Sequence, residues 1–344
     1  MMKVIFPLSL LSAYSFFNLL GVNHNLAKTQ ILYTLIGFFV FFLIKKINQR
    51  FFFENANFFY WFFIITLIIT YIIGLEAKGS KRWLDFYFFR FQSSEVLKIF
   101  FIVYLSVFLT KLRERVNLLK AFLASLFYLF IPLFIIVNQP DLANGLAYLF
   151  IYLMMVIFSP IPRKFLFYLF LIILILLPLF WQFLKPYQRE RITSFVNPEW
   201  EYRSSSYNMI QSIIAVGSGK FFGRGLGYGT QSKLYFLPER TTDFAFSTLV
   251  EQFGFLSGGL VIFLYFYIIY QLLGKIFSEI SSFDNLKSER LYFYIGLASY
   301  IFFQVFVNVG MNLGLLPVAG VALPVISYGG SAVVTFFFGL ALAF

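Results

Sequence analysis

Long apolar stretches recur along almost the whole chain, and they constrain its fold more than any other feature of the sequence. A helix needs about 20 mostly apolar residues to cross the hydrocarbon core of a bilayer. Ten stretches come close to that requirement: 4–22, 31–45, 58–75, 94–110, 121–137, 144–159, 165–184, 244–273, 291–314 and 329–344. Apolar residues make up 60% of the 344 residues and charged residues 12%, against about 25% charged in a soluble domain. The sequence predicts an all-α polytopic membrane protein with about ten transmembrane helices.

We expect residues 1–344 to form a single integral membrane domain, because no stretch is long and polar enough for a separate soluble domain. The longest polar segment, about 185–243, lies between the seventh and eighth apolar stretches. The first apolar stretch lacks a small-residue cleavage site and continues into a second, so it reads as a span rather than a removable signal peptide.

Lysine and arginine in short loops predict the orientation, since they are enriched on the cytoplasmic side. With the N-terminus inside, the short inner loops carry 13 of these residues and the short outer loops carry 5. The pattern favours the cytoplasmic (inner) membrane, with both termini in the cytoplasm and 185–243 outside. Function tends to reside in structured polar loops on one face of a scaffold, so we expect the chemistry on the outer face.

The chain has no cysteine and one histidine, His24. This excludes disulfides, thiolate catalysis, cysteine-ligated metals and sites with several histidines. The net charge of +12 suits anionic lipid or an anionic substrate. Nucleic-acid binding is disfavoured, because the basic residues are scattered over short loops rather than gathered in one patch.

Two charged residues lie within the fourth apolar stretch. Glu95 and Lys98 are three residues apart, so they share a helix face and can form an ion pair. Ser93 or Ser94 is a suitable N-cap for that helix. In the alternative interpretation, Glu95 only complements the helix dipole and Lys98 extends its ammonium to the membrane surface. Ionisable groups within spans are functional hypotheses by default, so both are candidate site residues.

Two other outer segments carry polar residues. Asn138–Asp141 separates two apolar stretches, and its alternative interpretation is a simple turn. Residues 310–331 are dense in Gly and Pro, with hydroxyls at Ser327 and Ser331. Irregular backbone at membrane depth is tolerated only where protein or a wet cavity satisfies it. A cavity-lining segment and close helix packing through small residues remain equal alternatives there.

A glycine-rich segment, 217–229, has six glycines in thirteen residues. Closely spaced glycines let backbone N–H groups cradle an anion, although a flexible outer loop has the same composition. The nearby cations favour the anion interpretation: Lys220, Arg224, Lys233 and Arg240.

Asp243 opens the eighth apolar stretch, directly after a proline-containing segment. It would lie at the N-terminal mouth of a helix, at the outer membrane boundary. An aspartate N-cap is the alternative interpretation. Glu251 is eight residues further on and off the same helix face, so the two are not an obvious close pair of carboxylates.

Five segments occur in the order and spacing of the SEDS family, the shape, elongation, division and sporulation proteins. They read KGSKRW, RFQSSEVLK, QPDLAN, GLGYGTQSKLYFLPERTTDFAF and GLLPVAGVALPVISYGGS. The chain resembles this family along essentially its whole length, and its RodA branch more than its FtsW branch. It departs from the family pattern at Ser93, where the family has Pro, at Ala143–Asn144, in place of Gly-Thr, and at Gln252, where a second Glu often follows Glu251.

The resemblance implies a peptidoglycan glycosyltransferase that polymerises lipid II outside the membrane during cell elongation, with a class B penicillin-binding protein as partner. We expect an inverting displacement of undecaprenyl pyrophosphate, with Asp243 as general base. The expected substrate-binding residues are Glu95, Lys98, Arg82, Lys233, Arg240, Asp141, Ser327 and Ser331. A divalent cation, Mg²⁺ or Mn²⁺, is compatible with this chemistry. The sequence shows no dedicated set of metal ligands, so the pyrophosphate would hold the ion.

Three other functions compete with this one. A lipid II transporter needs ionisable groups along a path near the midplane, and the deep parts of the spans carry almost none. An O-antigen ligase or polymerase would share the architecture, but the strings LPERTTDF and SYGGS argue against it. A non-catalytic scaffold of the wall-synthesis complex would not need Asp243 or the outer cations.

Overall fold

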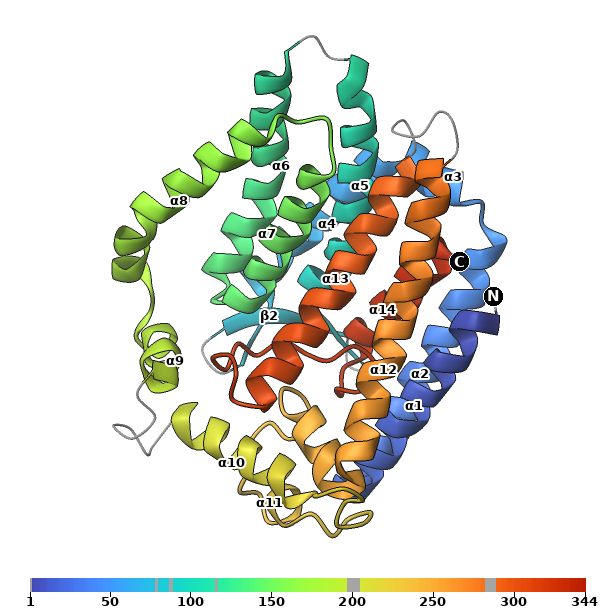
Figure 1. Ribbon diagram of the computed structural model, residues 1–344, viewed down its shortest axis with the longest axis vertical. Helices are drawn as coiled ribbons and strands as arrows, with labels where there is room; N and C mark the ends of the chain where they lie inside the picture. The colour runs from blue at the N-terminus through green and yellow to red at the C-terminus, as the bar shows by residue number, and fades with distance from the viewer. Residues whose placement is uncertain (1, 78–79, 87–88, 115–116, 197–204, 282–288) are drawn as a thin grey trace.

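The computed structural model describes residues 2–77, 80–86, 89–114, 117–196, 205–281 and 289–344. Most of them are helical (Figure 1). The helices are α1 (Met2–Val22), α2 (His24–Lys46), α3 (Gln49–Glu54), α4 (Ala56–Ile73), α5 (Ser93–Thr110), η1 (Lys111–Glu114, a 3-10 helix), α6 (Leu118–Asn138), α7 (Leu142–Ile157), α8 (Arg163–Phe183), α9 (Pro186–Val196), α10 (Ser205–Ser218), α11 (Thr230–Lys233), α12 (Ala245–Ser281), α13 (Glu289–Asn312) and α14 (Gly330–Ala343).

The helices follow the apolar stretches of the sequence. Each of the ten predicted stretches coincides with one helix, from α1 to α14. Within the described residues, seven helices are long and apolar enough to cross a membrane: α1, α2, α4, α5, α6, α12 and α13. α7 and α14 are shorter apolar helices. The helical membrane fold is therefore confirmed, while the count of ten spans stays a prediction.

Two helices, α5 and α13, form the centre of the bundle. They bury 83% and 78% of their most apolar windows, against 28% for α2 and α4. The peripheral helices turn Phe, Ile and Leu side chains outward: Phe39, Ile73 and Ile175 are all about 70% exposed. Apolar side chains on the outside suit hydrocarbon rather than water, as expected for helices in a bilayer.

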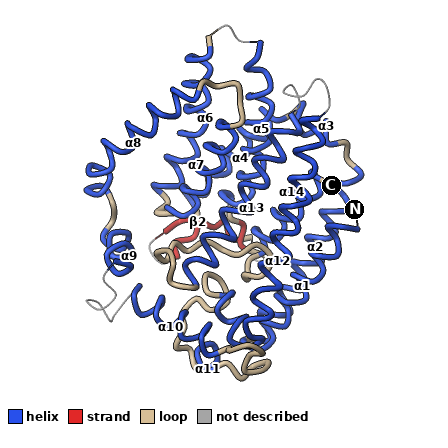
Figure 2. Tube along the Cα trace, in the orientation of Figure 1, coloured by secondary structure: helices blue, strands red, loops and turns tan. Residues whose placement is uncertain are grey.

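A small sheet interrupts the otherwise helical chain between α4 and α5, a feature that the all-α prediction did not include. Strands β1 (Leu75–Ala77), β2 (Ser80–Asp85) and β3 (Arg90–Phe91) pair antiparallel in that order. Figure 2 shows the strands beside the irregular segments at one end of the bundle. Hydrogen bonds of Ser331 to the backbone of Arg90 and Gln92 tie the sheet to the start of α14.

The 185–243 segment is folded, with three helices (α9, α10 and α11) among its described residues; residues 197–204 lie outside the described part. A small apolar cluster anchors the segment to the bundle: Met209, Ala215, Leu237, Phe244 and Val318. The segment therefore has a fixed position over one end of the bundle, where the predicted outer loops gather.

Helix α12 is interrupted at Gly254, whose φ of 80° is the left-handed backbone that favours glycine. The glycine-rich loop fills the break. Four backbone hydrogen bonds join them: Arg224 N–H to Glu251 C=O (2.9 Å), Gly225 N–H to Gln252 C=O (2.9 Å), Phe255 N–H to Lys220 C=O (2.8 Å) and Leu256 N–H to Phe221 C=O (3.3 Å). The loop thus satisfies backbone groups that the break removes from the helix ladder.

Candidate functional site

Asp243 is held at the mouth of α12 through its backbone. The side-chain amides of Asn308 and Asn312 each donate a hydrogen bond to the Asp243 carbonyl, both at 3.0 Å. The Asn312 amide oxygen in turn accepts from the Ser247 N–H at 3.0 Å. α13 therefore fixes the start of α12 with side-chain amides, and the half-buried carboxylate of Asp243 is not part of that anchor.

The position of Asp243 does not match the N-cap alternative. α12 begins at Ala245, so the flanking residue is Phe244 and Asp243 lies one position further out. The segment after α13 approaches its side chain. A Cβ at Gly320, whose φ is +74°, would lie 3.4 Å from Asp243 Oδ2.

Ser327 and Ser331 both direct their hydroxyls at backbone groups. Ser327 is buried, donates to the Thr242 carbonyl at 2.6 Å and accepts from the Leu323 N–H at 2.9 Å. Ser331 donates to the Arg90 carbonyl at 3.1 Å and accepts from the Gln92 N–H at 2.9 Å. These contacts position the loops on either side of the 315–330 segment. Direct contact of either hydroxyl with substrate stays a prediction.

The predicted ion pair in the fourth apolar stretch is present. Lys98 Nζ lies 2.7 Å from Glu95 Oε1, and both side chains are buried. The ammonium also lies 5.6 Å from the centre of the Tyr300 ring on α13. The pair is therefore enclosed between α5 and α13, rather than exposed at the surface as in the alternative interpretation.

The predicted N-cap of this helix is wrong. α5 begins at Ser93, so the flanking residue is Gln92, whose side chain makes no capping hydrogen bond. The Ser93 hydroxyl instead bonds to the hydroxyl of Thr70 on α4 at 2.9 Å. The packing of α4 against α5 therefore places this hydroxyl in a hydrogen bond between the helices. Its local preference, by contrast, is to cap a helix.

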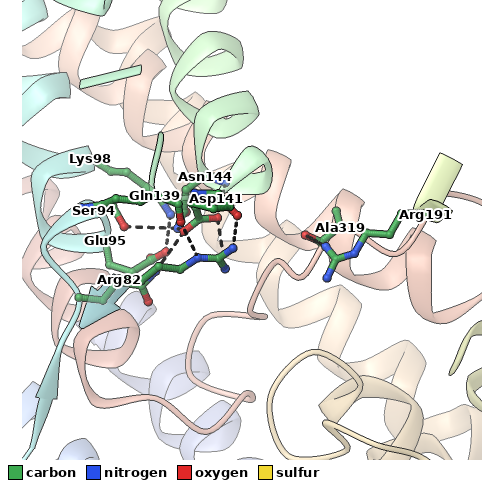
Figure 3. Close-up of polar contacts among 11 residues, drawn as sticks. Arg82, Ser94, Glu95, Lys98, Gln139, Asp141, Asn144, Arg191 and Ala319 are labelled. Atoms are coloured by element: carbon green, nitrogen blue, oxygen red, sulfur yellow. Dashed lines mark hydrogen bonds and ion pairs between the residues drawn. The ribbon is translucent and has the colours of Figure 1, made fainter. Parts of the chain in front are cut away.

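Arg82 and Asp141 come together beside this pair (Figure 3). Arg82 Nη1 lies 3.8 Å from Asp141 Oδ1, and the guanidinium also donates to the carbonyls of Gln139 and Pro140. Asp141 is the N-cap of α7, accepting from the Asn144 N–H at 3.3 Å and from the Asn144 amide at 2.8 Å. The segment therefore forms the turn of the alternative interpretation and also an ion pair with Arg82, while substrate binding by Asp141 stays a prediction.

The buried carboxylate of Glu251 binds backbone N–H groups of α11, the short helix that follows the glycine-rich segment. Glu251 Oε1 accepts from the Gln231 N–H at 2.8 Å, and Oε2 from the Ser232 N–H at 3.0 Å. A Cβ at Gly229 would lie 2.5 Å from Oε2. Glu251 thus holds α11 in place beside Gly229, and anion binding by the glycines of 217–229 stays a prediction.

The two other predicted cations of this segment lie against aromatic rings. Arg240 places its guanidinium carbon 3.6 Å from the ring centre of Tyr235. Lys233 Nζ lies 5.7 Å from the ring centre of Tyr228. Cation–π contacts of this kind occur at both exposed and buried sites. Each of these two cations therefore has an aromatic partner.

Four residues that the sequence did not single out as site residues hold or border Asp243 and the glycine-rich segment: Asn308, Asn312, Glu251 and Arg191. Amide side chains four residues apart in an apolar stretch are a recognisable signal, because polar groups in spans need a reason. Arg191 gave no such signal, since arginines are common in outer loops. Among the described residues, no group of three or more His, Asp or Glu gathers in a form that could hold a metal ion.

Comparison with known proteins gives one consistent result. A family model described as "Cell cycle protein" (FTSW_RODA_SPOVE) matches residues 1–343. The chain is 31% identical to the peptidoglycan glycosyltransferase MrdB of Escherichia coli K12, covering 99% of this chain and 91% of that one. It is 35% identical to a probable peptidoglycan glycosyltransferase FtsW of Wigglesworthia glossinidia brevipalpis, covering 92% and 82%.

Solved structures show the same fold. A chain of a peptidoglycan synthase complex, described as coordinating polymerization and crosslinking, matches with a TM-score of 0.83 and 25% identity, over 100% of this chain and 96% of that one. The rod shape determining protein RodA of Thermus thermophilus matches with a TM-score of 0.72 and 24% identity, over 99% and 94%.

Proposed function

We propose how this chain works from one premise: it belongs to the FtsW, RodA and SpoVE family and is a peptidoglycan glycosyltransferase. The proposed substrate is lipid II, a disaccharide carried on undecaprenyl pyrophosphate. The proposed product is a glycan strand made on the outer face of the cytoplasmic membrane during elongation. A membrane-embedded fold with polar segments at one end suits a substrate whose tail lies in lipid and whose sugars lie in water.

The proposed step is a single inverting displacement. The 4-hydroxyl of the acceptor sugar attacks the anomeric carbon of the donor, and Asp243 accepts the hydroxyl proton. The observation that carries this assignment is the anchoring of Asp243 at the mouth of α12, where Asn308 and Asn312 both bind its backbone carbonyl. This anchor gives the carboxylate a defined position at the outer end of the bundle, as a general base requires, and such a base contributes about 10²–10⁴-fold.

The second cluster is proposed to shape the groove in which the substrate lies. Arg82, Asp141, Glu95 and Lys98 gather between β2, α5 and α7. We expect a divalent cation, Mg²⁺ or Mn²⁺, to arrive with the pyrophosphate. Mg²⁺ commonly binds one or two carboxylates together with substrate phosphates, and the described residues offer single carboxylates rather than a cage.

Orientation and partner complete the proposal. We propose that both termini lie in the cytoplasm and the Asp243 end outside, as the lysine and arginine bias favours. The partner is a class B penicillin-binding protein that cross-links the new strand. Similarity to a chain of a complex that coordinates polymerization and crosslinking supports this partner.

Asp243→Asn tests the proposed base. Asparagine keeps the size of the side chain but cannot accept the proton, so polymer formation from labelled lipid II should fall by roughly 10²-fold or more. The assay uses purified protein with its penicillin-binding partner. Glu76→Gln, which neutralises an exposed carboxylate on β1, is the control and should retain wild-type turnover.

Folding and binding are measured beside turnover. Lipid II binding and the melting temperature should be unchanged in Asp243→Asn, because neither depends on the proton transfer. Turnover close to that of Glu76→Gln would refute the base assignment.

A further inference from the structure

Arg191 reaches from the outer segment to the irregular segment that follows α13. It lies on α9, is half-buried, and its Nη1 donates a hydrogen bond to the Ala319 carbonyl at 3.1 Å (Figure 3). These two residues are 128 positions apart in the chain. The contact brings a guanidinium from the 185–243 segment to the loop that approaches Asp243.

Gly320 lies between Arg191 and Asp243. A Cβ built on it would be 3.4 Å from Asp243 Oδ2 and 3.6 Å from Arg191 Nη1. The two side-chain atoms are therefore at most 7.0 Å apart, the sum of those distances. Gly320 has a φ of +74° and no side chain, so this segment can pass close to both of them.

The other cations predicted to bind substrate have their described contacts away from this segment. Arg82 binds Asp141 and two backbone carbonyls, Arg240 stacks on Tyr235, and Lys233 lies over Tyr228. Of the cations predicted from the sequence, none has a described contact with the Gly320 segment. Arg191 does have one.

We propose that Arg191 binds the pyrophosphate of the donor and stabilises its charge as it leaves, an assignment that rests on the proposed function. The acceptor oxygen bonds to the anomeric carbon as its proton passes to Asp243. The bond from that carbon to the phosphate oxygen breaks, and its electron pair stays on the pyrophosphate. A guanidinium matches phosphate oxygens with two parallel hydrogen bonds.

In an inverting displacement the attacking and leaving oxygens lie on opposite faces of the anomeric carbon. The base and the cation must therefore both reach one sugar. Asp243 Oδ2 and Arg191 Nη1 are at most 7.0 Å apart, which is close enough for both to contact one bound donor.

The test is product inhibition of lipid II polymerisation in the complex with the penicillin-binding partner. Undecaprenyl pyrophosphate and undecaprenyl monophosphate are the two probes. In Arg191→Gln, the inhibition constant of the pyrophosphate should rise about tenfold or more, the equivalent of one lost charge-assisted hydrogen bond. The constant of the monophosphate should change far less, and turnover should fall.

Arg189→Gln is the matched control. Arg189 is also on α9, but its guanidinium donates to the Gln182 carbonyl, so both inhibition constants should stay at wild-type values. If Arg191→Gln does not fold, Arg191→Lys replaces it. Lysine keeps the charge but loses the planar fork, and the pyrophosphate constant should rise about threefold. An unchanged constant in that variant would overturn the proposal.

Two further outcomes separate this proposal from the proposed function. If the wild type polymerises and Asp243→Asn does not, but Arg191→Gln behaves like Arg189→Gln, only the role of Arg191 is overturned. If turnover falls in Arg191→Gln while both inhibition constants are unchanged, Arg191 is a structural residue and the proposal fails. If the wild type makes no polymer, both proposals fail together.

Discussion

Glu251 and Asp243 show how much a carboxylate's role depends on its contacts. The sequence places them eight residues apart on one apolar stretch and predicts that they do not form a close pair. In the structure, Glu251 is fully buried and saturated by two backbone N–H groups of α11. Asp243 is half-buried, and its backbone carries the anchoring contacts. Two acidic residues eight positions apart thus differ in environment: Glu251 holds α11, whereas Asp243 is the residue for which we propose a chemical role.

The buried pair of Glu95 and Lys98 leads to a double-mutant prediction. Removing one partner of a buried ion pair leaves the other uncompensated, which costs about 3–5 kcal/mol. Glu95→Gln and Lys98→Met should each lower the melting temperature and impair polymerisation. The double variant should lose less than the sum of the two, because it leaves no buried charge unpaired.

The exposed pair Arg50–Glu54 is a matched control for this cycle. Its atoms are also 2.7 Å apart, but the side chains are 78% and 59% exposed. Glu54→Gln should therefore cost about 1 kcal/mol or less. Melting temperatures of the purified variants measure both effects. Strictly additive, small losses at Glu95 and Lys98 would contradict a coupled buried pair.

At the level of elements, the break in α12 depends on Gly254. Its left-handed backbone would cost another residue about 1–2 kcal/mol, and a Cβ there would be 2.3 Å from the Phe221 carbonyl oxygen. Gly254→Ala should therefore lower the apparent melting temperature and displace the glycine-rich loop. Protease sensitivity of that loop is a second measure.

Gly259→Ala provides the comparison on the same helix. Nothing lies within 4 Å of a Cβ at Gly259, and alanine in a helix is favoured over glycine by about 0.5–1 kcal/mol. This variant should be neutral or slightly more stable than the wild type. Equal losses of melting temperature in the two variants would contradict a specific packing role for Gly254.

The elements were predictable to different degrees for physical reasons. The long apolar stretches predict the ten helical regions, because in lipid the backbone N–H and C=O groups must hydrogen-bond within the segment. The strands β1–β3 and the helices of the 185–243 segment carry no such signal, because long-range packing decides them. The same holds for the site: Glu95 and Lys98 were predicted from helical spacing alone, whereas the contact of Arg191 with Ala319 joins segments 128 residues apart.

For the whole molecule, the testable quantity is orientation. The chain contains no cysteine, so a single introduced cysteine reports its own side of the membrane. Tyr228 is 73% exposed at the Asp243 end of the molecule, and Ser281 is exposed at the other end of α12. Tyr228→Cys should react with an impermeant thiol reagent in intact spheroplasts, and Ser281→Cys only after the membrane is broken. The reverse pattern would invert the proposed topology.

Helix α8 has no buried side chain among those described, and in Figure 1 it diverges from the rest of the bundle. Its lateral support therefore comes mainly from acyl chains, whose thickness and packing set the tilt of a helix that few protein contacts hold. α8 continues into α9, which carries Arg191. Temperature and lipid composition change the fluidity of the membrane, and they should therefore shift Arg191, the residue that we propose binds the donor pyrophosphate. Glycan synthesis by this protein should then depend on membrane fluidity.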